Sequence, residues 1–305
     1  MNVKRWPLLA LGSCIAIAWG LGGCGGGGGA ALEPGKIAFV SSRSGQDRIY
    51  TMDFAGSNVT EITVAGSGVS SPSLSPDETK VAYVTSKDGN AEIYVANVDN
   101  TGAPVRITNN TASDVQPAWS ADGTQLAWTR EANDVVLLDT IIVKPLTGAE
   151  QELIGDARNP AWSAAGEKLA YTSRSEGTEA IYIYTFSTLA SSKLITLQDS
   201  LGIDHLSWSP LGTIAYGRYD NTLAVPSGDV YVVNTTTAVT TPLINTAADE
   251  GHPAWSASGS KLVYYTNADG NYEIYSANAD GTGPTRLTND LGDDGTPGTS
   301  RGRVK

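Results

Sequence analysis

The sequence predicts an all-β fold, namely a six-bladed β-propeller of four-stranded antiparallel blades. The first indication is an internal repeat, because one pattern of short strands recurs six times between residues 36 and 288. The second is its spacing: successive repeats open 45, 43, 46 and 47 residues apart, and a propeller blade has about 40–45 residues. The third is the Asp-Gly pairs between strands, such as Asp88-Gly89 and Asp280-Gly281, because this pair favours tight hairpin turns.

Each repeat opens with a short strand that contains a shared motif. The residues that begin five of these strands are Pro72, Pro117, Pro160, Leu206 and Pro253. Four strands follow the pattern Pro/Leu-x-Trp-Ser, and the first has Leu74 in the tryptophan position. The four tryptophans are Trp119, Trp162, Trp208 and Trp255. We expect packing residues here rather than an aromatic ligand cage, because each aromatic side chain buries about 150–250 Å² and the repeat itself accounts for them.

Three further strands are predicted in every repeat. The second has a small residue between an apolar and an aromatic one, in the segments 37–39, 81–83, 126–128, 169–171, 214–216 and 262–264. The third contains an apolar pair, usually Ile-Tyr or Val-Tyr, at 49–50, 93–94, 141–142, 181–182, 230–231 and 274–275. The fourth closes the repeat at 61–63, 106–108, 152–154, 194–196, 243–245 and 286–288. Alternating apolar positions would face neighbouring blades, and the small central residue allows close packing of the sheets.

The first repeat begins at Lys36 without an opening strand, and the end of the chain offers a replacement. Residues 294–300 align with residues 250–256, and Pro297 stands 44 residues after Pro253. We therefore expect a C-terminal strand to complete the first blade, since closing the ring removes exposed sheet edges. The alternative is a disordered tail.

The repeat resembles the TolB-type propeller family, whose consensus runs Pro-x-Trp-Ser-Pro-Asp-Gly, an apolar-Ala-aromatic strand, Ile-Tyr, Asp-Gly and Leu-Thr. The copies most similar to it are residues 253–288 and 117–128, and the resemblance covers about residues 36–288. The resemblance implies the fold, but propellers of this type include both binding scaffolds and enzymes. The N-terminal α/β domain of the family's periplasmic member has no room between Cys24 and Lys36. The sequence thus predicts a TolB-like propeller without that domain.

The amino terminus predicts export. Lys4 and Arg5 precede an apolar run that is too short for a comfortable membrane span, which is typical of a signal peptide at residues 1–23. Leu21-Gly22-Gly23-Cys24 resembles a bacterial lipobox, which implies acylation of Cys24; an ordinary signal peptide is the alternative. Residues 24–35 would form the lipidated, glycine-rich tether, and residues 36–305 the propeller. We expect the protein in the periplasm or at the cell surface, in the outer membrane if there are two membranes.

Charge limits the classes of partner. The chain has a net charge of −12, and losing Lys4 and Arg5 with the signal changes it to −14. A nucleic-acid partner is not expected without a basic patch. The acidity serves either solubility or the attraction of a cation or a basic partner.

Acidic residues recur just before the opening strands and favour the second alternative slightly. They are Asp114, Asp156, Asp204, Asp249, Glu250, Asp293 and Asp294. The opening strand is the innermost one in propellers of this family, which implies that these residues gather around one channel mouth. We expect a ring of carboxylates there, formed by Asp114, Asp156, Asp249 and Asp294, that engages a cation or a basic peptide.

The residues directly before the opening motif form a column of polar side chains. They are Ser71, Gln116, Asn159, His205, His252 and Thr296, and they include both histidines of the chain. His205, His252 and Gln116 could ligate a divalent transition metal at the channel mouth. The alternative is that both histidines are structural and satisfied by hydrogen bonds.

These features predict an exported, lipid-anchored platform that binds a protein, a peptide or a glycan of the cell envelope. The rival prediction is a metal-dependent lyase or hydrolase acting on polysaccharide through the His205/His252/Gln116 column. No Gly-x-Ser-x-Gly or His-Glu-x-x-His motif is present, which favours binding over catalysis. A third alternative is an envelope protein with a purely structural role.

Overall fold

The computed structural model describes residues 35–295, apart from residues 65, 67, 135–137, 199, 221 and 223–226. The described residues all belong to one compact unit, Leu32–Lys305. The predicted signal peptide, Cys24 and most of the tether therefore lie outside the described residues, as does Thr296. Within the described part, no helix is both long and apolar enough to cross a membrane.

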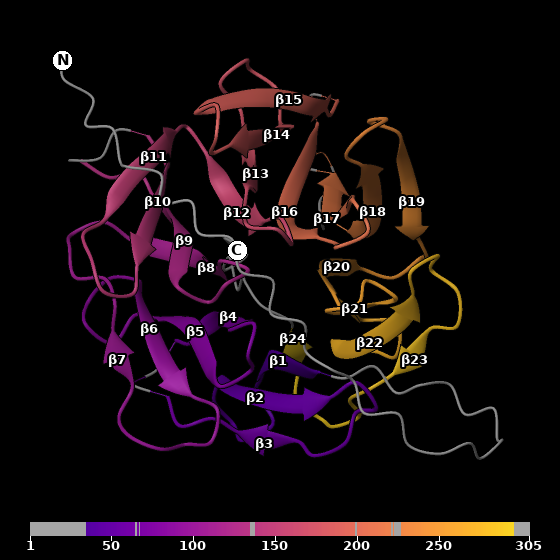
Figure 1. Cartoon of the computed structure of the whole chain (residues 1–305). Coiled ribbons are helices and arrows are strands. Elements are labelled where there is room, and N and C mark those ends of the chain that lie inside the picture. The colour runs from indigo at the N-terminus through magenta and orange to yellow at the C-terminus, as the bar shows by residue number, and fades with distance from the viewer. Residues whose placement is uncertain are drawn as a thin grey trace, which may run out of the picture. The chain divides into compact units, whose positions relative to one another are not determined.

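Six four-stranded antiparallel sheets form the blades of a ring, which confirms the predicted fold class. Their innermost strands face the centre of the ring (Figure 1). In the order of blades two to six and then one, these strands are β4 (Ser70–Leu74), β8 (Asp114–Trp119), β12 (Arg158–Trp162), β16 (Leu201–Trp208), β20 (Glu250–Trp255) and β24 (Asp294–Gly295).

The other strands follow outward in sequence order within each blade. The second strands of blades one to six are β1 (Lys36–Ser41), β5 (Lys80–Thr85), β9 (Gln125–Arg130), β13 (Lys168–Ser173), β17 (Thr213–Asp220) and β21 (Lys261–Thr266). The third strands are β2 (Arg48–Asp53), β6 (Glu92–Asn97), β10 (Thr140–Pro145), β14 (Ala180–Thr185), β18 (Gly228–Asn234) and β22 (Glu273–Asn278). The outermost strands are β3 (Thr60–Glu61), β7 (Val105–Arg106), β11 (Gln151–Gly155), β15 (Ala190–Thr196), β19 (Thr240–Ile244) and β23 (Thr285–Arg286).

The C-terminal segment closes the first blade, as predicted. β24 pairs with β1 through Val40 with Gly295 and Ser41 with Asp294, and the two strands lie side by side in Figure 1. Just beyond this pairing, the backbone N–H of Ser42 donates to the carbonyl oxygen of Asp293 at 3.1 Å. The ring is thus joined by hydrogen bonds between the two ends of the described chain.

The apolar core lies between blades rather than inside each one. One cluster joins Ala127 and Ile141 of blade three to Leu169 and Tyr171 of blade four, and all four residues are buried. The small residue at the centre of the second strand lets neighbouring sheets approach, as shown by the full burial of Ala127. Each blade therefore depends on its neighbours for a core, which fixes the innermost strands around the channel.

The closing strands of three blades are shorter than predicted. In blade two the expected strand at 106–108 is only Val105–Arg106, because Thr108 hydrogen-bonds through its side chain. Its hydroxyl accepts from the backbone N–H of Ile93 at 2.9 Å and donates to Glu92. In blade six Thr288 makes the same two contacts, with the N–H of Ile274 and with Glu273.

Candidate functional site

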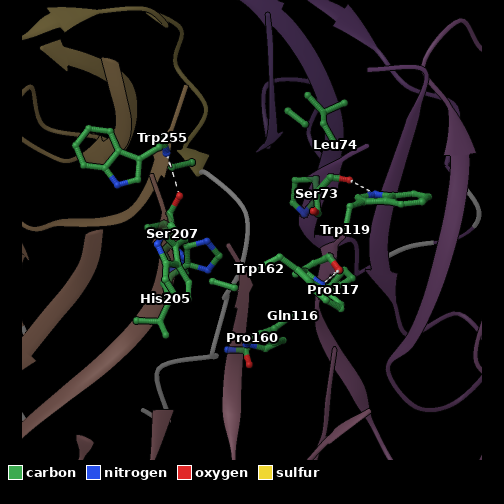
Figure 2. Close-up of a pocket in the computed structure, with 18 of the residues that line it drawn as sticks. Ser73, Leu74, Gln116, Pro117, Trp119, Pro160, Trp162, His205, Ser207 and Trp255 are labelled. Carbon is green, nitrogen blue, oxygen red and sulfur yellow. Dashed lines mark hydrogen bonds between the residues drawn. The ribbon is translucent and has the colours of Figure 1, made fainter. Parts of the chain in front are cut away.

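The innermost strands enclose a pocket of about 400 Å³ in the central channel. The tryptophans of the opening motif all line it: Trp119, Trp162, Trp208 and Trp255. Gln116, Asn159, His205 and His252 line it as well, so the structure brings four predicted site residues together. Figure 2 shows the labelled side chains of the pocket, with Trp119 and Trp162 among them. Aromatic walls and a few convergent polar groups are typical of a ligand site.

Two of the tryptophans also tie neighbouring blades together. The indole Nε1–H of Trp119 donates to the carbonyl oxygen of Ser73 at 3.0 Å, and that of Trp162 donates to Ala118 at 3.2 Å. Figure 2 shows the first of these bonds. Trp162 remains partly exposed in the pocket whereas Trp119 is 7% exposed. The predicted packing role is therefore present, and Trp162 in addition presents aromatic surface to the channel.

A β-bulge in β4, β8, β12, β16 and β20 positions the polar side chains. In blades two, three, four and six the bulge includes the residue before the motif proline. That residue has a positive φ in every case: Ser71 (49°), Gln116 (56°), Asn159 (54°) and His252 (47°). For non-glycine residues this conformation costs about 1–2 kcal/mol, and such strain tends to gather at functional sites. The proline supplies no N–H to the ladder, which favours a bulge at this point.

Two neighbouring bulge residues, Gln116 and Asn159, hydrogen-bond to each other on the channel wall. The Nε2 atom of Gln116 donates to Oδ1 of Asn159, and the backbone N–H of Asn159 donates to Oε1 of Gln116 at 3.2 Å. Each is also held by its own second strand: the hydroxyl of Thr129 donates to Gln116 at 2.9 Å, and Nδ2 of Asn159 donates to the hydroxyl of Thr172 at 3.1 Å. We call Ser71, Gln116, Asn159, Asp204 and His252 the polar belt.

Blade five departs from this pattern and places Asp204, rather than His205, in the polar belt. Its bulge lies between Ile203 and Leu206, and Leu206 pairs in register with Tyr216. A proline at that position could not donate to the ladder, so leucine allows the strand to resume one residue earlier. His205 consequently occupies the place that proline takes in the other blades, and it still lines the pocket.

Asp204 and the two histidines cluster on one side of the pocket. The Nε2 atom of His252 lies 3.5 Å from Oδ2 of Asp204, and the rings of His205 and His252 are 5.5 Å apart between centroids. Burial lowers the pKa of His205 to about 4, with a further lowering from His252. His205 is therefore neutral at pH 7 and can act as a hydrogen-bonding group.

The predicted carboxylate ring is not gathered in the pocket, because none of Asp114, Asp156, Asp249 and Asp294 lines it. Asp114 is fully buried and forms an ion pair with Arg130 at 2.8 Å. Asp294 is likewise buried and pairs with Arg43 at 2.8 Å. Oδ1 of Asp249 accepts from the N–H of Gly228, and Oδ2 of Asp156 accepts from the hydroxyl of Ser173. Of the acidic residues that precede the opening strands, Asp204 alone among those described lines the pocket.

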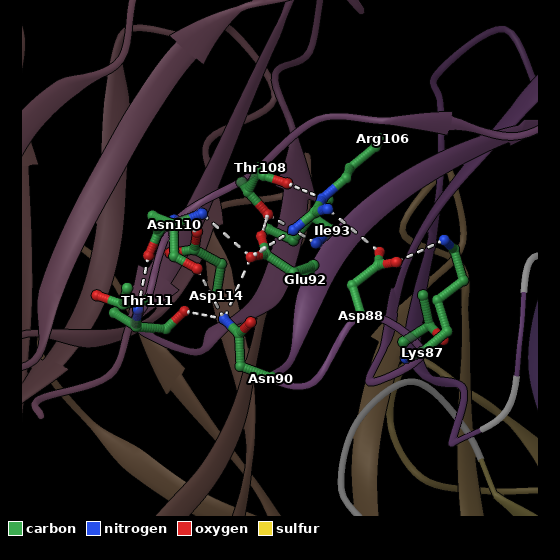
Figure 3. Close-up of polar contacts among 12 residues, drawn as sticks. Lys87, Asp88, Asn90, Glu92, Ile93, Arg106, Thr108, Asn110, Thr111 and Asp114 are labelled. Carbon is green, nitrogen blue, oxygen red and sulfur yellow. Dashed lines mark hydrogen bonds and ion pairs between the residues drawn. The ribbon is translucent and has the colours of Figure 1, made fainter.

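Asp114 belongs to a polar network that connects blades two and three. Its Oδ2 accepts from the side chain of Asn110 at 2.6 Å, as Figure 3 shows. Next to it, the buried carboxylate of Glu92 accepts from Arg106 at 3.0 Å and from Asn90 at 3.2 Å. Burial raises the pKa of Asp114, while Arg130 and its hydrogen bonds oppose that shift. These contacts make Asp114 a structural residue.

The predicted metal ligands His205, His252 and Gln116 all line the pocket. Within the described part of the chain, no group of three or more His, Cys, Asp or Glu residues could hold a metal ion. Gln116 is engaged with Asn159 and Thr129, whereas the two histidines contact each other and Asp204. A divalent cation held by His205, His252 and Gln116 stays a prediction.

Known proteins identify the repeat. The family model described as the TolB beta propeller domain matches residues 67–134. A protein named TolB homolog from Chlorobaculum tepidum is 37% identical over 84 residues, which are 28% of this chain and 19% of that protein. The repeat of this chain is therefore a TolB-type β-propeller repeat.

The structural comparison agrees on the fold. The crystal structure of TolB from Acinetobacter baumannii superposes with a TM-score of 0.75 at 21% identity, covering 88% of this chain and 67% of that one. The Tol-Pal system protein TolB of Desulfosudis oleivorans is 42% identical over 52 residues, or 17% of this chain and 12% of that protein. The aligned segment thus spans about a fifth or less of each of these curated relatives.

Sequence reasoning counted Asp204 among the acidic residues of the channel mouth but left it out of the carboxylate ring and the polar column, and it missed Gly217 as the neighbour of Asp204. Gly217 lies on β17, where the structurally equivalent residues of the other blades with a bulge are Val84, Thr129, Thr172 and Tyr265. Two signals could have found them: leucine in place of the motif proline, and glycine in a position that is otherwise a larger residue. Both occur in the same repeat.

Proposed function

We propose that this TolB-type propeller is an exported, lipid-anchored binding protein that holds a protein or peptide segment of the cell envelope in its channel pocket. The observation that carries the proposal is the pocket itself, which combines tryptophan walls with the polar belt. Its volume of about 400 Å³ lies within the usual range of ligand sites. A short stretch of peptide, rather than a folded surface, matches a space of this size.

The chemistry of the walls supports a peptide ligand. Indole rings bury large apolar areas and tolerate varied side chains. The backbone of an extended peptide needs hydrogen-bonding groups, such as the neutral imidazole of His205. The strained backbone at four belt positions also agrees with a binding role for the channel. A glycan would use similar aromatic and polar contacts and is the competing outcome of the test below.

The relatives and the amino terminus support the location. Proteins with matching segments carry the names TolB homolog and Tol-Pal system protein TolB. Lys4, Arg5 and the following apolar run with Cys24 are typical of an exported lipoprotein. Two or more acyl chains at Cys24 give stable anchoring, which would hold the propeller close to partners in the envelope.

Site-specific photo-crosslinking in native cells tests the proposal. A photoreactive amino acid at position 164 places the probe at the exposed pocket residue Ala164. The matched control is position 189, because Leu189 is 69% exposed and lies between β14 and β15, away from the pocket. We expect a discrete protein adduct from position 164 that is absent from position 189. The same adducts from both positions, a glycan adduct, or none from position 164 would contradict the proposal.

A further inference from the structure

We propose that Asp204 is the counter-ion for a positively charged nitrogen of the bound peptide, from a lysine side chain, an arginine side chain or a free amino terminus. This inference rests on the proposed function, since it concerns the same pocket. It differs from the expected carboxylate ring, because it assigns the selection of charge to one residue in blade five.

Two glycines, Gly217 and Gly251, leave space for the Asp204 carboxylate. A Cβ atom at Gly217 would lie 2.1 Å from Oδ1 of Asp204, and one at Gly251 would lie 3.1 Å from Oδ2. A side chain at position 217 is therefore incompatible with the observed carboxylate position. The larger residues at the equivalent positions, such as Thr129 and Thr172, instead hold the belt amides of their own blades. Blade five thus has glycine where blades three and four have a supporting threonine, and the Asp204 carboxylate occupies the space.

In this position the carboxylate remains accessible from the pocket. The Asp204 side chain is 19% exposed, compared with 2% for its neighbour His252. It lines the same pocket as the four tryptophans. A ligand group that enters the pocket can therefore reach the carboxylate.

The charges around the pocket favour a cation. Among the described residues that line it, Asp204 is the only carboxylate, and Lys36 is the only lysine or arginine. Lys36 is exposed at the start of β1, whereas His205 next to Asp204 is neutral at pH 7 because its pKa is about 4. His252 contacts Asp204 through Nε2 and can donate a hydrogen bond that orients it.

The strength of the resulting bond adds to this preference. A charge-assisted hydrogen bond to a carboxylate is about twice as strong as a neutral one. The Asp204 carboxylate therefore selects a cationic side chain over a neutral side chain of the same length.

Selection from a displayed library of random decapeptides tests the inference on the full-length protein. We expect peptides enriched on the wild type to share a lysine, an arginine or a free amino terminus at a fixed place beside aromatic or apolar residues. Selection on Asp204→Asn should lose the shared basic group. Asp47→Asn is the matched control, because Asp47 is an exposed loop residue outside the pocket and its substitution removes the same charge.

Calorimetry with one selected peptide then measures the effect. Replacing its basic residue by glutamine, or acetylating its amino terminus, should weaken binding to the wild type by about tenfold or more. The same change should have little effect on Asp204→Asn, and raising the salt concentration should weaken only the charged pair. The comparison of the two peptides on the wild type needs no protein variant. Equal binding of both peptides would therefore overturn the inference even if Asp204→Asn does not fold.

The other outcomes distinguish a failure of this inference from a failure of the proposed function. Enriched peptides without a shared basic group, or equal binding by wild type and Asp204→Asn, would overturn the role of Asp204 and leave a peptide-binding propeller. A library from which no peptide is enriched on the wild type would overturn both.

Discussion

Replacing Glu92 by glutamine should destabilise the propeller far more than its conservative chemistry suggests. Glu92 is the first residue of β6, and its side chain is fully buried against the loop that leads to β8. Its carboxylate accepts from Arg106 at 3.0 Å, from the N–H of Asn110 at 3.2 Å and from Asn90 at 3.2 Å, and Thr108 donates to the other oxygen. Figure 3 shows this arrangement of donors around one acidic group.

The magnitude follows from the number of bonds that change. A hydrogen bond to a charged group contributes about 1.5–3 kcal/mol and a neutral one about 0.5–1.5 kcal/mol. Glu92→Gln can keep the three bonds to one oxygen, without their charge assistance, but its amide NH₂ faces the donating hydroxyl of Thr108. We therefore expect a loss of about 2–3 kcal/mol in the free energy of unfolding, or about 5–10 °C in Tm for a protein of this size.

Urea denaturation followed by circular dichroism and tryptophan fluorescence measures this loss, with coincident transitions as the check on two-state behaviour. Glu273→Gln should give a similar loss, because Glu273 has equivalent bonds to Arg286, Asn271 and Thr288. Glu61→Gln is the control, since Glu61 is half exposed and lies 3.9 Å from Arg48, and it should cost less than about 0.5 kcal/mol. Equal small effects in all three variants would refute the reasoning.

Four further results are expected. Because the pKa of His205 is lowered to about 4 in the folded state, the stability of wild type relative to His205→Gln should fall by about 1–3 kcal/mol as pH drops from 7 to 4; a constant difference would contradict this. The pKa of Asp294 is raised to about 6, chiefly by burial. Wild type should therefore gain stability relative to Asp294→Asn as pH drops from 7 to 4. Urea denaturation at both pH values measures this gain, and its absence would contradict the expectation. Trp162→Phe should cost about 1 kcal/mol through its bond to Ala118, whereas no change in the urea midpoint would show that this bond contributes nothing. Cys24→Ala should move the protein from the membrane to the soluble fraction, and its retention in membranes would count against the anchor.

The repeat allowed the architecture to be predicted from the sequence. Strand motifs at a period of about 45 residues predict the blades, and the match of residues 294–300 to 250–256 predicts the closing strand. Asp294 and Gly295 of that segment pair with β1. The ends of the closing strands were not readable, because Thr108 and Thr288 replace ladder bonds with side-chain bonds. Such a substitution depends on the buried glutamate on the neighbouring strand and not on local propensity.

The candidate site was only partly readable. A shared place in the repeat is enough to bring Gln116, Asn159 and His252 to the channel wall. It does not show that Asp114 and Asp294 are paired with arginines, because those partners come from a neighbouring part of the fold. Nor does it show that Asp204 replaces His205 in the polar belt, because a shift of one residue in the bulge decides which side chain faces the channel.

The most direct test of the account is a crystal structure of the full-length protein with a library-selected peptide. The account predicts peptide density in the channel beside Trp162 and Trp208, with a basic nitrogen of the peptide within hydrogen-bonding distance of an Asp204 oxygen. A peptide bound along an outermost strand, with the channel pocket holding only water, would contradict it.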